Sequence, residues 1–522
     1  MRAGVMGAIV VALLGGVWLG YQALFSGGCD GGYCPAGIDV DPPQGFAFAS
    51  DIYEFRGELP TLPEGGSIEI DIPLEGGLES ATGLSFYRYL PESSAWELVA
   101  TATIDESGER AVGSFQGVPE TIVLMQRSLP AGHVSAFIDP GQQIHPAAME
   151  NATLFHTRDF SPGGDGSING QLTALQLEPG QEHYPVISAS PEIDGSVPNL
   201  DAILETSATR TSHVQHIAEL VVAHEVDGIT IDYSALRDDQ RTSFSLLIEE
   251  LGIEMERQGK GLAVVAPPPL RTPERIEPGP VDWEVIGAAA DFIVLEPIRD
   301  QSTYRRDLPL ILDYLHERVP PRKILLGITP YAAERSEDVR RLTLVEAMRI
   351  ATQIEVGDTT PATNDIVELR GVNIDQTEGR LSGLLWDTTT ATVAFTYREN
   401  GGRTVWLENV FSVSFKLEFV TAYGLGGFSV EDASNNEMLG NIWPALVRFV
   451  ETGQPTLLQP GPEELEPEWE VSGGSLEGGQ RGVARWTTPS EPGTYTVRLT
   501  VSDGSFRFEN EIQVTVEARD QD

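Results

Sequence analysis

Apolar residues between about positions 133 and 450 form short runs that alternate with stretches of helical periodicity. In residues 212–224 and 241–258, apolar side chains recur three and four positions apart, which predicts amphipathic helices. Strands that alternate with helices are typical of a parallel α/β sheet. Eight strands with intervening helices predict an α/β fold, a TIM (β/α)8 barrel within residues 131–452. The expected strands are residues 134–138, 153–156, 184–188, 228–233, 262–266, 292–295, 324–328 and 426–430.

The regions on both sides of this barrel show period-two alternation instead. Residues 45–128 contain short alternating runs broken by Gly and Pro, such as SIEIDI at residues 67–72. This pattern predicts an N-terminal β-sandwich. Residues 460–518 alternate again, clearly so at residues 495–501, and predict a second, C-terminal β module.

The N-terminal residues 1–25 are predicted to be a targeting segment. Arg2 gives a minimal positive start, and residues 5–20 contain no polar side chain. An uncleaved membrane anchor is favoured, with a cleaved signal sequence or lipid attachment at Cys29 as alternatives. Residues 26–44 are predicted to be a linker. The rest of the chain is then expected at the cell surface or secreted, where Cys29 and Cys34 could form a disulfide.

Composition narrows the classes of partner. The formal net charge is -44, so nucleic-acid binding is excluded, because phosphate contacts require clustered Lys and Arg. Two cysteines cannot form a structural zinc site alone, and the histidines show no metal-ligand spacing. The glycine-rich residues 162–170 lack the Lys of a phosphate-binding loop, so they are expected to be a loop over the barrel mouth. No cofactor is predicted.

The most informative motif is VDGITIDYSAL at residues 226–236. It resembles the D-G-x-D-x-D-x-E strand of glycoside hydrolase family 18, the chitinase family. Asp227 and Asp232 match this pattern, whereas Thr230 replaces an Asp and Ser234 replaces the catalytic Glu. The resemblance implies substrate-assisted hydrolysis, in which that Glu protonates the leaving oxygen and the adjacent Asp orients the substrate's acetamide. Serine is too weak an acid for this step, and loss of general acid catalysis costs roughly 10²–10⁴ in rate.

Further motifs extend the resemblance in both directions. Asp282-Trp283 and Leu326-Gly327-Ile328 with Tyr331 resemble the approach to strand six and strand seven of the family. The residues from 385 to 427 are similar to the spore-cortex and germination type, including its small insertion before strand eight. Residues 469–471, 493–497 and 501–504 resemble polycystic-kidney-disease repeats, which implies an immunoglobulin-like β-sandwich at residues 460–518.

Candidate site residues follow from the barrel, whose active face lies at the carboxyl ends of the strands. Two replacements relative to the family introduce carboxylates there. Residues 296–299 align with the family's Met-x-Tyr-Asp, so Glu296 stands in place of the Met and Arg299 in place of the Asp. Glu431 stands where the family has a Trp. Either Glu could act as a relocated acid if its pKa were raised by burial. Ser234 replaces the acid itself. The further candidates for catalysis or binding are Asp232, Asp139, Asp159, Asp227, Thr230, Tyr233 and Tyr331, with Asp227 expected to support the others through hydrogen bonds.

These observations favour an extracellular protein that binds N-acetylglucosamine-containing polysaccharide, chitin-like or peptidoglycan, with hydrolysis lost or much reduced. Two alternatives stay open. The protein could be an active glycosidase with Glu296 or Glu431 as the acid, or a structural surface protein. The membrane would then be a partner through the N-terminal anchor only.

Overall fold

The computed structural model describes residues 32–519, except residues 39, 43–45, 58–67, 75–83, 92–94, 106–109, 116, 128–131, 192, 194, 358, 377–382 and 400. The chain divides into two compact units. The first comprises residues 1–132, 417–424 and 448–457, and the second comprises residues 133–416, 425–447 and 458–522. The predicted targeting segment and Cys29 lie outside the described residues. Among the residues that are described, no helix is long and apolar enough to cross a membrane.

The first unit contains two antiparallel sheets. Residues of both sheets, among them Ile70, Ile72, Phe86 and Leu124, form one buried apolar cluster. The period-two pattern therefore predicted strands correctly here, and the classification as a β-sandwich stays a prediction. The larger sheet consists of β1 (Gly32–Pro35), β3 (Tyr53–Arg56), β9 (Thr121–Arg127), β5 (Leu84–Leu90) and β6 (Ala95–Thr101), with β2 (Phe46–Phe48) paired to β9, and the smaller of β4 (Ile68–Pro73), β8 (Arg110–Phe115) and β7 (Thr103–Ile104).

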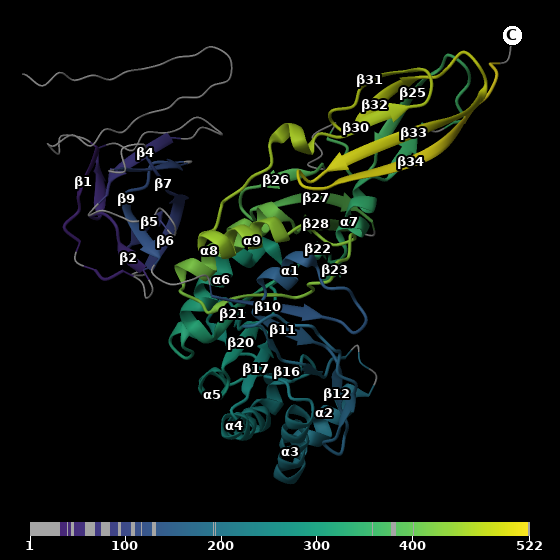
Figure 1. Cartoon of the computed structure of the whole chain (residues 1–522). Helices are drawn as coiled ribbons and strands as arrows, with labels where there is room; N and C mark the ends of the chain where they lie inside the picture. The colour runs from purple at the N-terminus through teal and green to yellow at the C-terminus, as the bar shows by residue number, and fades with distance from the viewer. Residues whose placement is uncertain are drawn as a thin grey trace, which may run out of the picture. The chain divides into compact units, whose positions relative to one another are not determined.

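The second unit is built on a curled sheet of parallel strands that contains all eight predicted strands (Figure 1). Its path runs from β15 through the other strands to β11, which pairs with β14. Only Tyr184 and Pro185 separate β14 from β15, so the path returns to its start. The strands are β10 (His133–Ile138), β11 (Leu154–Thr157), β14 (Glu182–His183), β15 (Val186–Ser188), β16 (Gly228–Asp232), β17 (Gly261–Ala266), β20 (Phe292–Leu295), β21 (Ile324–Ile328) and β29 (Gly427–Val430).

Helices follow most of these strands, and α3, α4 and α5 lie on the outer side of β16, β17 and β20 (Figure 1). Helix α4 buries Phe244, Leu247 and Leu251, as its periodicity predicted, and it ends at Gly259, whose φ of 66° suits glycine. The helices are α1 (Pro146–Asn151), α2 (Ser196–Glu205), α3 (Ser207–Ala223), α4 (Arg241–Gln258), α5 (Trp283–Ala289), α6 (Gln301–His316), α8 (Val410–Ala422) and α9 (Trp443–Thr452), with 3-10 turns at Asp238–Gln240, Pro321–Lys323 and Pro462–Leu465.

The glycine-rich segment, predicted to be a loop over the barrel mouth, is a hairpin, and its residues Ser161, Asn169 and Gly170 line a cavity. It consists of β12 (Phe160–Pro162) and β13 (Ile168–Gly170), and β12 pairs with β15. The carbonyl oxygen of Gly166 lies 2.8 Å from His213 Nδ1 and 3.0 Å from His216 Nδ1. These two contacts hold the hairpin against α3. Neither the alternation of apolar residues nor the glycine content of the segment could predict them, because they come from a distant helix. A separate two-stranded ribbon pairs β18 (Leu270–Arg271) with β19 (Ile276–Glu277).

The predicted insertion before the eighth strand lies between β21 and β29. It has a five-stranded antiparallel sheet and helix α7 (Leu344–Ala351). In order across the sheet, the strands are β23 (Val339–Leu342), β22 (Ala332–Arg335), β28 (Gly402–Leu407), β27 (Thr392–Arg398) and β26 (Leu385–Asp387).

The C-terminal β module is built from two separate parts of the chain. The insertion supplies β24 (Ile354–Val356) and β25 (Ile366–Gly371), which pair in the order β24-β25-β32-β31 with β32 (Val483–Thr487) and β31 (Ser475–Gly478). A second sheet contains β30 (Glu468–Val471), β33 (Gly493–Ser502) and β34 (Arg507–Val516). Leu369 of the insertion is buried in the same cluster as Trp486. The sequence placed this module at residues 460–518 alone, and its kinship with immunoglobulin-like repeats stays a prediction.

Candidate functional site

A cavity of about 1180 Å³ lies at the carboxyl ends of the barrel strands. It brings together seven residues singled out from the sequence. These are Asp139, Asp159, Asp232, Ser234, Glu296, Arg299 and Glu431. Residues that were predicted to share the carboxyl-end face of the barrel therefore line one cavity.

Asp232 ends β16, and Ser234 follows on the same side of the chain because side chains alternate along a strand. Both line the cavity. Burial raises the pKa of Asp232, Arg158 opposes this shift, and Glu431 adds to it. Ser234 thus presents a hydroxyl group beside Asp232 in the cavity lining.

Glu296 follows β20, where its backbone N–H donates to the carbonyl oxygen of Ala266 at 3.0 Å. Burial, reinforced by repulsion from Asp232, raises the pKa of Glu296 to about 7, although Arg299 acts in the opposite direction. A carboxyl group with this pKa is partly protonated at neutral pH, as a general acid must be. Glu296 therefore has the pKa, raised by burial, that a relocated acid requires.

Glu431 is held by two arginines. Arg299 forms a bidentate pair with its carboxylate, at 2.7 Å and 3.2 Å, and Arg341 Nη1 lies 3.3 Å from Glu431 Oε1. A proton on this carboxyl group would weaken both pairs. Of the two candidate acids, Glu296 is suited to donate a proton and Glu431 is not.

The remaining charged groups of the cavity are also paired. Arg158 Nη1 lies 3.1 Å from Asp139 Oδ1, and its guanidinium lies 4.9 Å from the centre of the Phe137 ring. Arg340 pairs with the buried Glu334. The carboxylate of Asp139 is therefore paired with Arg158 at the rim of the cavity and is not free.

Asp159 has a structural environment. Its carboxylate accepts hydrogen bonds from Thr157, from the N–H of Thr173 at 3.1 Å and from Thr173 Oγ1 at 2.6 Å. Its own carbonyl is approached closely by Gly170, whose φ is 137° and whose Cβ, if present, would lie 2.0 Å from that oxygen. These contacts attach the β12–β13 hairpin to the cavity wall.

Asp227 and Thr230 do not line the cavity. Asp227 precedes β16 at the opposite end of the strand, where its carboxylate accepts the N–H of His183 at 2.9 Å. This is a supporting hydrogen bond, although its partner is a backbone group and not the other site residues. Thr230 is fully buried and lies 2.7 Å from His156 Nδ1. Burial lowers the pKa of His156 to about 3, so this ring is neutral.

Tyr233 and Tyr331 also lie outside the cavity. Tyr233 is buried, and its hydroxyl lies 2.5 Å from His213 Nε2 on α3, because strand alternation turns it away from the side that Asp232 occupies. The interpretation of Tyr233 as a sugar contact was therefore wrong. Tyr331 donates to Asp432 at 2.5 Å, and the Arg341 guanidinium lies 4.3 Å from its ring centre. Tyr331 reaches the site only through Arg341.

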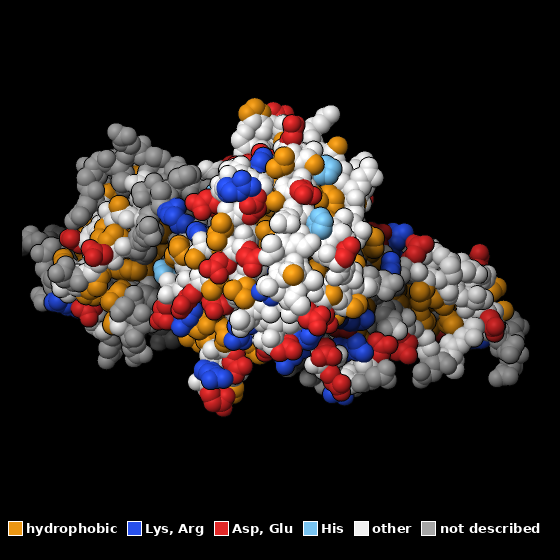
Figure 2. All heavy atoms as spheres, turned by 90° about the horizontal axis from the view of Figure 1, so that it is seen from below, with side chains coloured by type: hydrophobic (Ala, Val, Ile, Leu, Met, Phe, Trp, Pro, Cys, Tyr) orange, Lys and Arg blue, Asp and Glu red, His pale blue; other side chains and the backbone are white. Residues whose placement is uncertain are grey.

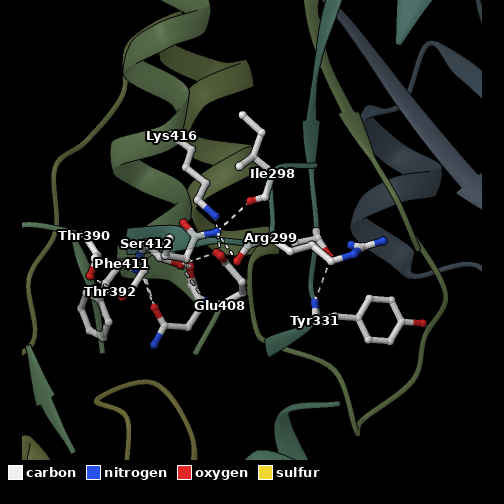
Figure 3. Close-up of polar contacts among 12 residues, drawn as sticks. Ile298, Arg299, Tyr331, Thr390, Thr392, Glu408, Phe411, Ser412 and Lys416 are labelled. Atoms are coloured by element: carbon white, nitrogen blue, oxygen red, sulfur yellow. Dashed lines mark hydrogen bonds and ion pairs between the residues drawn. The ribbon is translucent and has the colours of Figure 1, made fainter. Parts of the chain in front are cut away.

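The segment that carries Glu296 and Arg299 is positioned by groups that the sequence did not single out. Gln301, which begins α6, donates to the carbonyl of Ile298 at 2.8 Å and to that of Arg299 at 3.2 Å. Figure 3 shows Lys416 and Glu408 pointing toward one another beside this segment. Both are almost fully buried, and Ser412 Oγ donates to the same carboxylate at 2.8 Å. The scarcity of lysine in the chain is the one sequence signal that could have drawn attention to Lys416.

Among the described residues, no group of three or more His, Cys, Asp or Glu side chains is arranged to hold a metal ion. The carboxylates of Asp139 and Glu431 pair with arginines, and that of Asp159 accepts hydrogen bonds from threonines. The carboxyl groups of Asp232 and Glu296 have no such partner among the described residues.

The sequence model of the family described as glycosyl hydrolases family 18 matches residues 176–435. The chain contains a family 18 domain. This family has a TIM barrel fold, in agreement with the curled parallel sheet, and its insertion before strand eight is present. Di-N-acetylchitobiase of Mus musculus is 23% identical over 269 residues, which cover 45% of this chain and 71% of the mouse protein. The enzyme of the same name from Rattus norvegicus is 24% identical over the same shares of the two chains.

Two solved structures are similar to part of this chain. A chitinase from Chromobacterium violaceum is 22% identical, with a TM-score of 0.46, over 62% of this chain and 99% of that chain. The spore cortex-lytic enzyme SleL of Bacillus megaterium is 14% identical, with a TM-score of 0.46, over 65% of this chain and 78% of that chain.

Proposed function

We propose that this protein is an extracellular glycan-binding protein whose cavity takes N-acetylglucosamine-containing polymers, chitin-like or peptidoglycan, with hydrolysis lost or much reduced. The observation that carries the proposal is the pair Asp232 and Ser234. The cavity keeps the Asp that orients an acetamide in the family, and it presents a hydroxyl where the family has its acid. The curated relatives named di-N-acetylchitobiase support the ligand class.

The changed positions form a coherent set, which supports a rebuilt site over a decayed one. Arg299 and Glu431, which stand at two family positions of different chemistry, form a bidentate ion pair across the cavity. Random loss would not supply a guanidinium opposite a new carboxylate. A cavity that keeps ordered, paired side chains is suited to selective binding.

Hydrolysis through Glu296 is the second candidate. Its pKa of about 7 and its position on the cavity wall near Asp232 favour it. In this reading Asp232 orients the acetamide, whose oxygen attacks the anomeric carbon while the glycosidic bond breaks and Glu296 protonates the leaving oxygen. Water then attacks the anomeric carbon, the bond to the acetamide oxygen breaks, and Glu296 takes back a proton from that water.

The test is binding and product release from N-acetylglucosamine oligomers and peptidoglycan by the purified protein, with products resolved by mass. Binding without products supports the binding function. Products that disappear in Glu296→Gln and persist in Glu256→Gln, an exposed α4 control, support the second candidate. Absence of both binding and products refutes both and favours a structural surface protein.

The proposed location rests on residues 1–25, with their uninterrupted apolar run. Fractionation of cells that express the full chain tests it. A membrane-bound product accessible to added protease supports an anchor, and a soluble cytoplasmic product refutes the extracellular location.

A further inference from the structure

The inner wall of the cavity holds three oxygen-bearing side chains that lack partners. Ser188 of β15 is directly opposite Asp232 of β16 in the strand register. Ser188 is 7% exposed, and its hydroxyl has no hydrogen-bond partner among the described residues. Within the same part of the chain, neither Asp232 nor Glu296 makes a side-chain hydrogen bond or an ion pair within 4 Å. All three line the one cavity.

Arg158 favours the charged form of Asp232, and Arg299 that of Glu296, but neither arginine forms an ion pair with these carboxyl groups. Arg158 pairs with Asp139, and Arg299 with Glu431. Arg341 also pairs with Glu431, and Arg340 lies against Glu334. The arginines are thus each engaged with another acid, and the two carboxyl groups of the inner wall stay available to a ligand.

The number and type of these groups indicate what the ligand presents. A protonated amine has three N–H donors and no acceptor, and the wall offers three acceptors, namely one hydroxyl and two carboxyl groups. An acetamide offers a single N–H, which can satisfy Asp232 but leaves the other two groups without a donor. Charge-assisted hydrogen bonds from an ammonium group to a carboxylate are roughly twice as strong as hydrogen bonds between neutral groups.

We propose that the cavity selects a de-N-acetylated hexosamine, a glycan unit with a free amine, whose ammonium group binds between Ser188, Asp232 and Glu296. This inference rests on the proposed glycan-binding function and specifies its ligand. The net charge of -44 attracts cationic polymers toward the protein. Figure 2 shows acidic side chains spread over the visible face, with Lys and Arg beside them singly or in small groups.

The raised pKa of Glu296 adds a distinctive signature. A bound cation favours the charged form of a neighbouring carboxyl group. Binding of the amine near neutral pH is therefore expected to release a proton from Glu296, whereas binding of an uncharged acetamide is not.

Calorimetry with glucosamine tetramer and N-acetylglucosamine tetramer tests the proposal, using the full protein at about pH 6, where free amines are largely protonated. The glucosamine tetramer is expected to bind at least about tenfold more tightly, as one additional charge-assisted contact would give. At neutral pH its apparent enthalpy is expected to depend on the ionisation enthalpy of the buffer, which reports proton release.

Glu296→Gln and Ser188→Ala are expected to remove most of the preference, and Glu256→Gln on the exposed face of α4 is expected to keep it. Equal or tighter binding of the acetylated tetramer overturns this inference and leaves the proposed function intact. If neither tetramer nor peptidoglycan binds, both proposals fail. The two tetramers are compared on the unmodified protein, so this part of the test holds even if a variant fails to fold.

Discussion

Replacing Glu296 by Gln should stabilise the protein, and the size of the effect should depend on pH. The ordinary pKa of this carboxyl group is 4.5, and the folded site raises the pKa to about 7. The folded state therefore binds the proton more tightly than the unfolded state does. The stability that this proton contributes is fully present below about pH 4.5 and is lost as the pH rises through about 7. Gln has no proton to lose and resembles the protonated form at every pH.

The magnitude follows from the shift. One pKa unit corresponds to 1.36 kcal/mol, so a rise from 4.5 to about 7 corresponds to about 3 kcal/mol. The free energies of unfolding of the Glu296→Gln variant and the unmodified protein should nearly coincide at about pH 4. They should diverge between about pH 4.5 and 7, with Gln more stable by up to about 3 kcal/mol above that range.

Urea unfolding followed by tryptophan fluorescence at several pH values measures this difference. Glu256→Gln, on the exposed face of α4, serves as the matched control and should show no such divergence. A difference between Glu296→Gln and the unmodified protein that stays flat from pH 4 to 8 would refute the reasoning, because the carboxyl group would then titrate alike in both states.

Three further outcomes are expected. Arg299→Ala and Glu431→Ala should be non-additive in a double-mutant cycle of urea unfolding, with a coupling of about 1–3 kcal/mol, and additivity would contradict the bidentate pair. Lys416→Met should lower the free energy of unfolding by about 3–5 kcal/mol because it leaves the buried Glu408 unpaired, and an unchanged urea midpoint would contradict that burial. Leu369→Ala should cost about 2–5 kcal/mol and increase limited proteolysis of the C-terminal module, whereas unchanged cleavage there would contradict the shared sheet.

The sequence located the strands and the cavity because both depend on local patterns. The run at residues 228–233 became β16, and the carboxyl ends of the strands placed Asp232, Ser234, Glu296 and Glu431 around one cavity. The same alternation could have excluded Tyr233, since a residue next to an inward Asp232 faces the helices. The position of Asp227 before β16 was enough to predict that it lies at the amino end of the strand, opposite the cavity.

The sequence by itself determined the order of the strands along the chain, the insertion before the eighth strand and the serine two residues after Asp232. Only the tertiary structure decided which carboxylates are engaged. Arg299 meets Glu431 from a distant part of the chain, and Glu296 gains its high pKa from burial and from Asp232. It also decided that Val367 of the insertion pairs with Trp486 of the C-terminal module. Hydrophobic periodicity is a property of neighbouring residues, whereas ion pairs, desolvation and sheet partners depend on groups that folding brings together.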